Sequence, residues 1–182
     1  MMSPSLRVQL VVFDWAGTTV DFGSCSPVAA FQQTFHKADI QVSETELRQF
    51  MGKHKKEHIR SVLELPNIRQ QWQNIYKRDW TQEDLNNLFD QYLPTQLEVL
   101  PSFSKVISEV PAAVEALRTK DIKIGSSTGY TREMLDIVSK VAAEDGYAPD
   151  FSVTVSEAPG RPSPFMALRN AEHFGIYPLR TM

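Results

Sequence analysis

One acidic residue follows a run of apolar residues near the start of the chain. Val11, Val12 and Phe13 precede Asp14, and a Gly-Thr-Thr turn begins at Gly17. An apolar, β-branched run indicates a buried strand, and open α/β folds bind ligands outside the carboxyl ends of such strands. We therefore expect Asp14 at a strand end, where a substrate could reach it. The competing interpretation is a turn former or helix cap, both common for Asp.

A second group of reactive side chains lies in residues 53–58, where three lysines fall within four positions. A solvated charge run is the default interpretation. On a helix, however, Lys55 shares a face with Ile59 and Val62, and His58 lies one turn away. Burial disfavours the ammonium form of a lysine, which leaves the amine available as a nucleophile near neutral pH. Lys55 is therefore the candidate nucleophile of this group.

Two further segments carry groups suited to binding an anion. Thr128 and Gly129 follow the predicted strand 122–127 and precede a helix. A hydroxyl and backbone N–H groups at such a turn can bind an anion, although an ordinary helix cap is the competing interpretation. Arg161 lies in a loop restrained by glycine and proline, where its cation could neutralise anionic oxygens. Its competing interpretation is a solvated arginine.

The elements that must position these groups form an α/β pattern interrupted by one all-helical block. Apolar runs predict strands at 8–13, 122–127 and 151–155. Cap and periodicity signals, including a capping box at Ser43-x-x-Glu46, predict helices at 26–37, 43–50, 53–64, 68–78, from 81 onward, from 111 onward, 131–144 and 164–174. We therefore predict an α/β core of residues 1–22 and 100–182 with an inserted helical cap domain of residues 23–99.

Composition limits the class of protein. The chain has 182 residues, 42% hydrophobic and 23% charged, with a net charge of −3, which is typical of a globular protein and does not suggest a nucleic-acid surface. A single cysteine, Cys25, fits a reducing compartment. No signal peptide and no apolar run long enough to span a membrane is apparent. We expect a cytoplasmic protein that binds neither nucleic acid nor membrane.

The quoted residues resemble known motifs. Phe13-Asp14-x-x-Gly-Thr-x-x-Asp21 is similar to the first motif of the haloacid dehalogenase superfamily, whose first Asp attacks phosphorus. Most phosphatases of that superfamily carry a second Asp where this chain has Ala16. The version with alanine resembles the phosphonoacetaldehyde hydrolase (phosphonatase) family. So do Met-Gly-x-x-Lys, Ser-x-Thr-Gly-Tyr-Thr-Arg-Glu-Met and Gly-Arg-Pro-x-Pro.

This resemblance implies a Rossmann-like core and hydrolysis of the carbon–phosphorus bond of phosphonoacetaldehyde, a small phosphonate, to acetaldehyde and phosphate. Lys55 would form a Schiff base with the aldehyde, and Asp14 would accept the phosphoryl group as an aspartyl phosphate. Ala16 fits this chemistry, because an enamine leaving group needs no proton from an acid at that position.

The resemblance assigns further roles within the two domains. Thr128 would hold the phosphoryl group, with Gly129 beside it, and Arg161 would neutralise charge around it. His58 would relay protons during imine formation. Met51 would pack beside the imine, and a gap-filling core methionine is an equally good interpretation. Cys25 and Tyr130 lie near these motifs and receive no definite role.

Mg²⁺ is the cofactor that the resemblance implies, bridging Asp14 and a phosphonate oxygen with the Ala16 carbonyl as another ligand. A homodimer formed through the cap is also implied. The family's fourth strand motif, which supplies further acidic ligands, has no counterpart after Glu172. We therefore expect a parallel sheet that is incomplete at its C-terminal side and impaired activity. Two alternatives stay open: a catalytically silent homologue that only binds a ligand or partner, and a generic phosphate-ester hydrolase.

Overall fold

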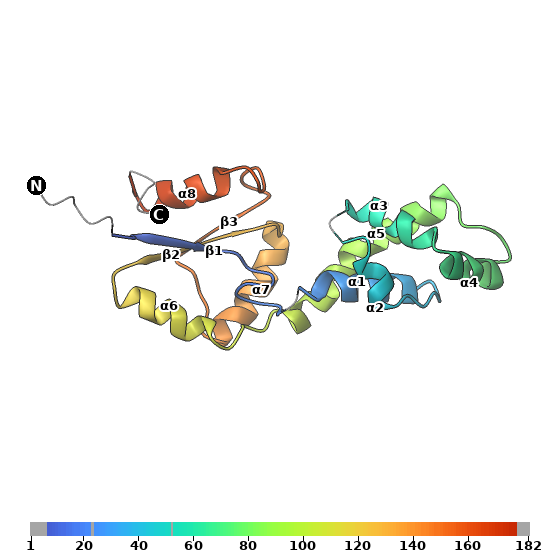
Figure 1. The fold of residues 1–182 in the computed structure, drawn as a ribbon, viewed down its shortest axis with the longest axis horizontal. Helices are drawn as coiled ribbons and strands as arrows, with labels where there is room; N and C mark the ends of the chain where they lie inside the picture. The colour runs from blue at the N-terminus through green and yellow to red at the C-terminus, as the bar shows by residue number, and fades with distance from the viewer. Residues whose placement is uncertain (1–6, 23, 52, 178–182) are drawn as a thin grey trace, which may run out of the picture. The chain divides into compact units, whose positions relative to one another are not determined.

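The computed structural model describes residues 7–22, 24–51 and 53–177. The chain divides into two compact units, one of Met1–Ser24 with Pro101–Met182 and one of Cys25–Leu100 (Figure 1). The sequence-based prediction placed the first boundary two residues earlier, after residue 22, and the second one residue earlier, after residue 99. We call the first unit the core and the second the cap, and describe each by itself.

The core is built on a parallel sheet of three strands in the order β1-β2-β3, as the alternating pattern predicts. The strands are β1 (Leu10–Phe13), β2 (Lys123–Thr128) and β3 (Phe151–Thr154). Phe13 pairs with Ser126, and Thr128 pairs with Thr154, so the three carboxyl ends lie at one edge of the sheet. Among the described strands, β1 pairs with β2 alone and keeps one unpaired edge.

Helices cover both faces of this sheet. Helix α8 (Phe165–His173) lies on one face, and α6 (Val110–Arg118) and α7 (Arg132–Glu144) lie on the other (Figure 1). A short 3-10 helix, η1, spans Leu100–Phe103. Thr131 caps α7 by accepting a hydrogen bond from the backbone of Met134, so α7 starts directly behind the turn that follows β2.

The described part of the cap contains helices and no strand. They are α1 (Ser26–His36), α2 (Glu44–Arg48), α3 (Lys55–Leu63), α4 (Pro66–Tyr76) and α5 (Gln82–Val99). The predicted capping box at Ser43 and Glu46 is present, and Thr81 and Asp84 form a second one. The predicted start of α4 at residue 68 is wrong. Pro66 begins this helix, because the first helical position needs no N–H donor.

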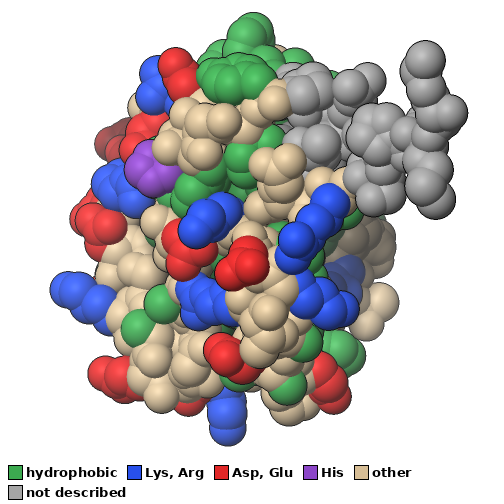
Figure 2. Space-filling model, turned by 90° about the vertical axis from the view of Figure 1, so that its left-hand side faces the viewer, with side chains coloured by type: hydrophobic (Ala, Val, Ile, Leu, Met, Phe, Trp, Pro, Cys, Tyr) green, Lys and Arg blue, Asp and Glu red, His purple; other side chains and the backbone are tan. Residues whose placement is uncertain are grey.

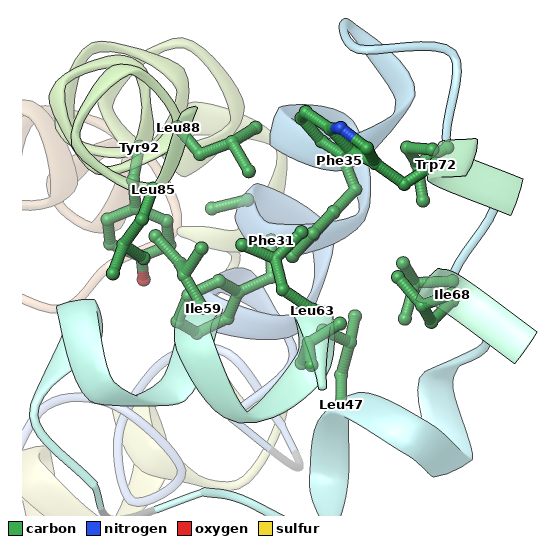
Figure 3. Packing of buried hydrophobic residues seen from close by; sticks show 14 of the residues in the cluster. Phe31, Phe35, Leu47, Ile59, Leu63, Ile68, Trp72, Leu85, Leu88 and Tyr92 are labelled. Carbon is green, nitrogen blue, oxygen red and sulfur yellow. The ribbon is translucent and has the colours of Figure 1, made fainter. Parts of the chain in front are cut away.

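The cap has a hydrophobic core of its own. Phe31 lies near the middle of it, with Ile59 from α3 and Tyr92 from α5 beside it (Figure 3). Full burial of one such side chain contributes about 1.5–3 kcal/mol. The labelled residues of Figure 3 come from all five helices, so each helix contributes an apolar face to this core.

The surface carries charges of both signs. On the face shown in Figure 2, lysine and arginine side chains are interspersed with aspartate and glutamate, without a continuous patch of one sign. In the part of the chain that the structure describes, no helix combines the length and the apolar character needed to cross a bilayer.

Candidate active site

Asp14 directly follows β1 and is held by the turn that it precedes. The backbone N–H of Trp15 donates to Asp14 Oδ1 at 2.8 Å. The hydroxyl of Thr19 donates to the Asp14 backbone carbonyl at 2.9 Å. The Asp14 side chain is 29% exposed, so a fixed carboxylate at the strand end remains accessible.

The Gly-Thr-Thr turn is tight. The carbonyl of Trp15 accepts backbone hydrogen bonds from Thr18, Thr19 and Val20 at 3.1, 2.9 and 3.1 Å. Gly17 has a φ of +79°, and a Cβ added there would lie 2.6 Å from Ser24 Oγ. The positive φ favours glycine at this position, and a side chain there would also displace the Ser24 hydroxyl. The turn therefore fixes the backbone around Asp14 and Ala16.

Arg161 pairs with Asp14 across 147 positions of sequence. Its Nη2 donates to Asp14 Oδ1 at 3.0 Å, and its Nη1 lies 2.9 Å from Oδ2. This two-pronged geometry is the strong form of an arginine–carboxylate contact. The arginine comes from the loop between β3 and α8 and keeps 53% of its side chain exposed. It is therefore not merely solvated, because it neutralises the carboxylate at the strand end.

Thr128 ends β2 at the same edge of the sheet. Its buried hydroxyl accepts a hydrogen bond from the backbone N–H of Tyr130 at 3.1 Å. Thr131, and not Thr128, caps the following helix. The Thr128 hydroxyl keeps its own proton for a further partner. A Cβ at Gly129 would meet no atom within 4 Å, so this backbone position faces open space.

A glutamate that the sequence interpretation missed braces the loop after β3. Glu157 accepts from the Thr154 backbone at 2.8 Å, from its hydroxyl at 3.0 Å and from Arg132 Nη2 at 2.5 Å. Burial works against the charged form, but these hydrogen bonds and the arginine prevail and lower the pKa of Glu157. Arg132 belongs to the predicted motif that contains Thr128, and this is the sequence signal for the contact between Arg132 and Glu157. The glutamate thereby links the turn after β2 to the loop that carries Arg161.

In the cap, Lys55 begins α3 among aromatic rings. Its Nζ lies 5.6 Å from the centre of the Phe31 ring and 5.8 Å from that of Tyr92. The helix face assigned to Lys55 is the buried one, since Ile59 and Val62 are both 0% exposed. Burial lowers the pKa of Lys55 from its ordinary value of 10.5. The neutral amine is therefore more populated than that of a solvated lysine.

His58 packs against the same ring. The centres of the His58 and Phe31 rings are 3.9 Å apart, and His58 is 1% exposed. Burial, and secondarily the charge of Lys55, lower the pKa of His58 to about 4, against a smaller opposing effect of a hydrogen bond with the Leu47 backbone. Among the described residues His58 Nε2 has no hydrogen-bond partner. His58 is therefore neutral at pH 7, so its ring can accept a proton.

The other residues of the lysine cluster differ from Lys55. Lys53 Nζ donates to the Ser61 hydroxyl at 2.9 Å in an exposed contact. Lys56 is half-buried and its Nζ lies over a different ring, 5.5 Å from the centre of Phe89. Met51 is 37% exposed, which argues against a gap-filling core methionine. The adjoining Gly52 of the predicted cap motif lies outside the described residues.

The donors that could hold a metal are few. Within residues 7–22, 24–51 and 53–177, no three His, Cys, Asp or Glu side chains gather as a metal site. The Asp14 carboxylate and the Ala16 carbonyl are hard oxygen donors, the type that Mg²⁺ prefers. Mg²⁺ is commonly held by one or two carboxylates, with substrate phosphates and water as its other ligands. The residues present therefore fit part of a Mg²⁺ coordination shell.

The structure thus joins the predicted residues in two groups. In the core, Asp14 contacts Arg161 at the sheet edge where Thr128 also lies. In the cap, Lys55 and His58 both lie against the Phe31 ring. The two groups differ in chemistry, since the first combines a carboxylate, a guanidinium and a hydroxyl and the second an amine and an imidazole.

Comparison with known proteins identifies the family. The model of the haloacid dehalogenase-like hydrolases matches residues 8–182. A phosphonoacetaldehyde hydrolase of Bacillus cereus is 40% identical over 178 residues, which cover 97% of this chain and 67% of that protein. One from Bacillus anthracis is 41% identical with the same coverage. The chain thus spans about two thirds of the length of these curated relatives.

Solved structures agree with this assignment. The crystal structure of a phosphonoacetaldehyde hydrolase-like protein from Oleispira antarctica superposes with a TM-score of 0.71 at 34% identity, over 97% of this chain and 64% of that one. A predicted phosphoglycolate phosphatase from Haemophilus somnus, 16% identical with a TM-score of 0.67 over 98% of this chain and 76% of its own, shares the fold. By its sheet, its strand-end carboxylate and the match over residues 8–182, the chain belongs to the haloacid dehalogenase-like hydrolases, and within them it is similar to the phosphonoacetaldehyde hydrolases.

Proposed function

We propose that the chain hydrolyses the carbon–phosphorus bond of phosphonoacetaldehyde to acetaldehyde and phosphate. The observation that carries this proposal is the environment of Lys55, an amine near the Phe31 and Tyr92 rings whose pKa is lowered by burial. Hydrolysis of an ordinary phosphate ester has no use for such an amine. Ala16 supports the same substrate class, because an ester would need a proton donor for its leaving oxygen.

The cap residues activate the leaving group. Lys55 attacks the aldehyde as a neutral amine, and loss of water gives a protonated imine. When the carbon–phosphorus bond breaks, the imine accepts the electron pair and becomes an enamine. His58, neutral at pH 7, takes up and returns protons during imine formation. Protonation of the enamine at carbon and hydrolysis of the resulting imine release acetaldehyde and restore Lys55.

The core residues receive the phosphoryl group. Asp14 attacks phosphorus and forms an aspartyl phosphate, which water then hydrolyses. In the ligand-free chain both Asp14 oxygens pair with Arg161, so an incoming phosphonate competes for that guanidinium and frees the nucleophile. The Thr128 hydroxyl and the backbone at Gly129 are the donors for the phosphoryl oxygens. Mg²⁺, held by the Asp14 carboxylate and the Ala16 carbonyl, would reduce repulsion between the two anions.

Reductive trapping tests the central step. Borohydride added with phosphonoacetaldehyde reduces the imine to a stable secondary amine, which peptide mass spectrometry assigns to one lysine. We expect the adduct on Lys55, its loss in Lys55→Arg and its retention in Lys53→Arg, the matched exposed control. Phosphate release should be lost in the first variant alone.

Two outcomes would favour the alternatives. An adduct without phosphate release indicates a catalytically silent homologue. Hydrolysis of p-nitrophenyl phosphate without any action on the phosphonate indicates a generic phosphate-ester hydrolase. We also propose a homodimer formed through the cap, for which light scattering should give twice the 20.7 kDa mass of one chain.

A further inference from the structure

A chain of hydrogen bonds runs from Trp15, the residue after Asp14, through β2 to β3. The indole Nε1–H of Trp15 donates to Ser126 Oγ at 2.8 Å. The Ser126 hydroxyl donates to Ser152 Oγ at 2.7 Å. Trp15 and Ser126 are each 0% exposed. One buried serine thus connects the residue after the nucleophile to the strand on the far side of the sheet.

The indole contact is specific to this position. Trp72 in the cap is also buried, at 2% exposure, yet its Nε1 has no hydrogen-bond partner among the described residues. Trp15 is held at two points, since its ring also packs edge-on against Tyr147, with centroids 5.1 Å apart. These two contacts therefore fix the position of the Trp15 indole relative to β2.

Trp15 transmits this placement to Asp14. Its own N–H binds Asp14 Oδ1, and its carbonyl accepts three N–H groups of the Gly-Thr-Thr turn. A shift of Trp15 would move the carboxylate and the turn together.

Ser126 is held from the other face of the sheet as well. The Asn170 side chain of α8 donates to the Ser126 backbone carbonyl at 3.0 Å. A Cβ on the neighbouring Gly125 would clash with Asn170 Oδ1, so glycine allows this close approach. The serine is thereby anchored independently of the loop that it supports.

We propose that Ser126 is a positioning residue for the nucleophile, acting through Trp15 on Asp14. Its side chain is fully buried, so we assign it no contact with substrate. Its hydroxyl accepts one hydrogen bond and donates another, which alanine cannot do and threonine can. The inference rests on the proposed function, in which Asp14 attacks phosphorus in line. Misplacing a reacting group by about 1 Å can lower the rate by about 10²-fold.

Four variants test the contact. Ser126→Ala removes the acceptor, Trp15→Phe removes the donor and keeps a ring, and the double variant removes both. Ser126→Thr keeps the hydroxyl. The matched controls are Trp72→Phe, which removes an indole N–H without a partner, and Ser139→Ala, whose hydroxyl lies 3.5 Å from the Asp136 carbonyl.

We expect Ser126→Ala and Trp15→Phe to lower kcat for phosphate release by about 10- to 100-fold with little change in KM. The double variant should be no worse than the poorer single variant, and Ser126→Thr should recover most of the rate. The rate of borohydride trapping at Lys55 should not change. Additive losses, an unchanged kcat in Ser126→Ala, or equal losses in the controls would overturn the inference.

Two readouts separate this inference from the proposed function. In ¹⁵N–¹H spectra the Trp15 indole resonance, assigned by its loss in Trp15→Phe, should move in Ser126→Ala and stay in Ser139→Ala. An unmoved resonance refutes the contact whatever the activity. If the unaltered chain releases no phosphate, the proposed function fails. The positioning role of Ser126 is then tested by the capture of beryllium trifluoride on Asp14, followed by ¹⁹F NMR. Weaker capture in Ser126→Ala supports the positioning role, and equal capture overturns it.

Discussion

At the scale of single residues, the cap holds two titratable groups against one aromatic ring. Lys55 and His58 both contact Phe31, and burial disfavours the charged form of each. Such perturbed groups gather at functional sites, because nucleophiles and bases need pKa values suited to their task. Lowering the pKa of both residues leaves a neutral amine and a neutral imidazole available together.

His58 makes the stability of the chain depend on pH. Its pKa is about 4 in the folded chain against 6.5 for a free histidine, so the unfolded chain binds the proton more tightly. The contribution of His58 to the free energy of unfolding is therefore complete above pH 6.5, and it falls by roughly 3 kcal/mol as the pH drops toward 4. Urea unfolding at pH 7 and pH 4 measures the difference. His58→Phe should reduce it and His36→Gln, an exposed control, should not; equal pH sensitivity in His58→Phe would contradict the assignment.

Sequence reasoning recovered the residues that carry local signals. Lys55 is separable from Lys53 and Lys56 by helical periodicity alone, and the structure places it on the buried face. Arg161 was expected to neutralise anionic oxygens, but its direct contact with Asp14 leaves no local signal, since 147 positions separate the two residues. The roles of Glu157 and Ser126 were missed, because the contact of Glu157 with Arg132 and that of Ser126 with Trp15 join residues 25 and 111 positions apart.

At the scale of elements, the turn after β1 determines where the nucleophile stands. Gly17→Ala should destabilise the chain by more than about 1 kcal/mol, because the residue has a φ of +79° and its new methyl would meet Ser24 Oγ. Gly129→Ala is the matched control for stability, since a Cβ there meets nothing within 4 Å. Thermal unfolding compares the two. A melting temperature for Gly17→Ala equal to that of Gly129→Ala would show that the turn does not require glycine.

Element boundaries were predictable where a side chain specifies them. The capping box of Ser43 and Glu46 and the cap of α7 at Thr131 both appear where the sequence places them. The start of α4 was predicted too late because Pro66 was interpreted only as the end of the preceding helix. A proline disfavours helix in the residue before it, but it is also a favourable first residue of a helix. The first strand begins at Leu10 rather than residue 8, since pairing with β2 and not hydrophobicity sets its start.

At the scale of the whole molecule, the chain combines two units with separate cores. The cap has its own cluster around Phe31, and the core has smaller clusters where α8 packs on the sheet. The sequence predicts the inserted cap as a helical block that interrupts an alternating pattern of strands and helices. The proposed reaction divides in the same way, with imine chemistry assigned to the cap and phosphoryl transfer assigned to the core.

This division predicts different responses to metal removal. Mg²⁺ would be held by Asp14 and Ala16 of the core, whereas Lys55 needs only its amine to condense with the aldehyde. Chelation with EDTA should therefore abolish phosphate release while borohydride still traps the substrate on Lys55, and added Mg²⁺ should restore release. Lys55→Arg should show neither the adduct nor phosphate release at any Mg²⁺ concentration. If EDTA prevented the adduct as well, the metal would act before imine formation, and the assignment of the two steps to separate units would fail.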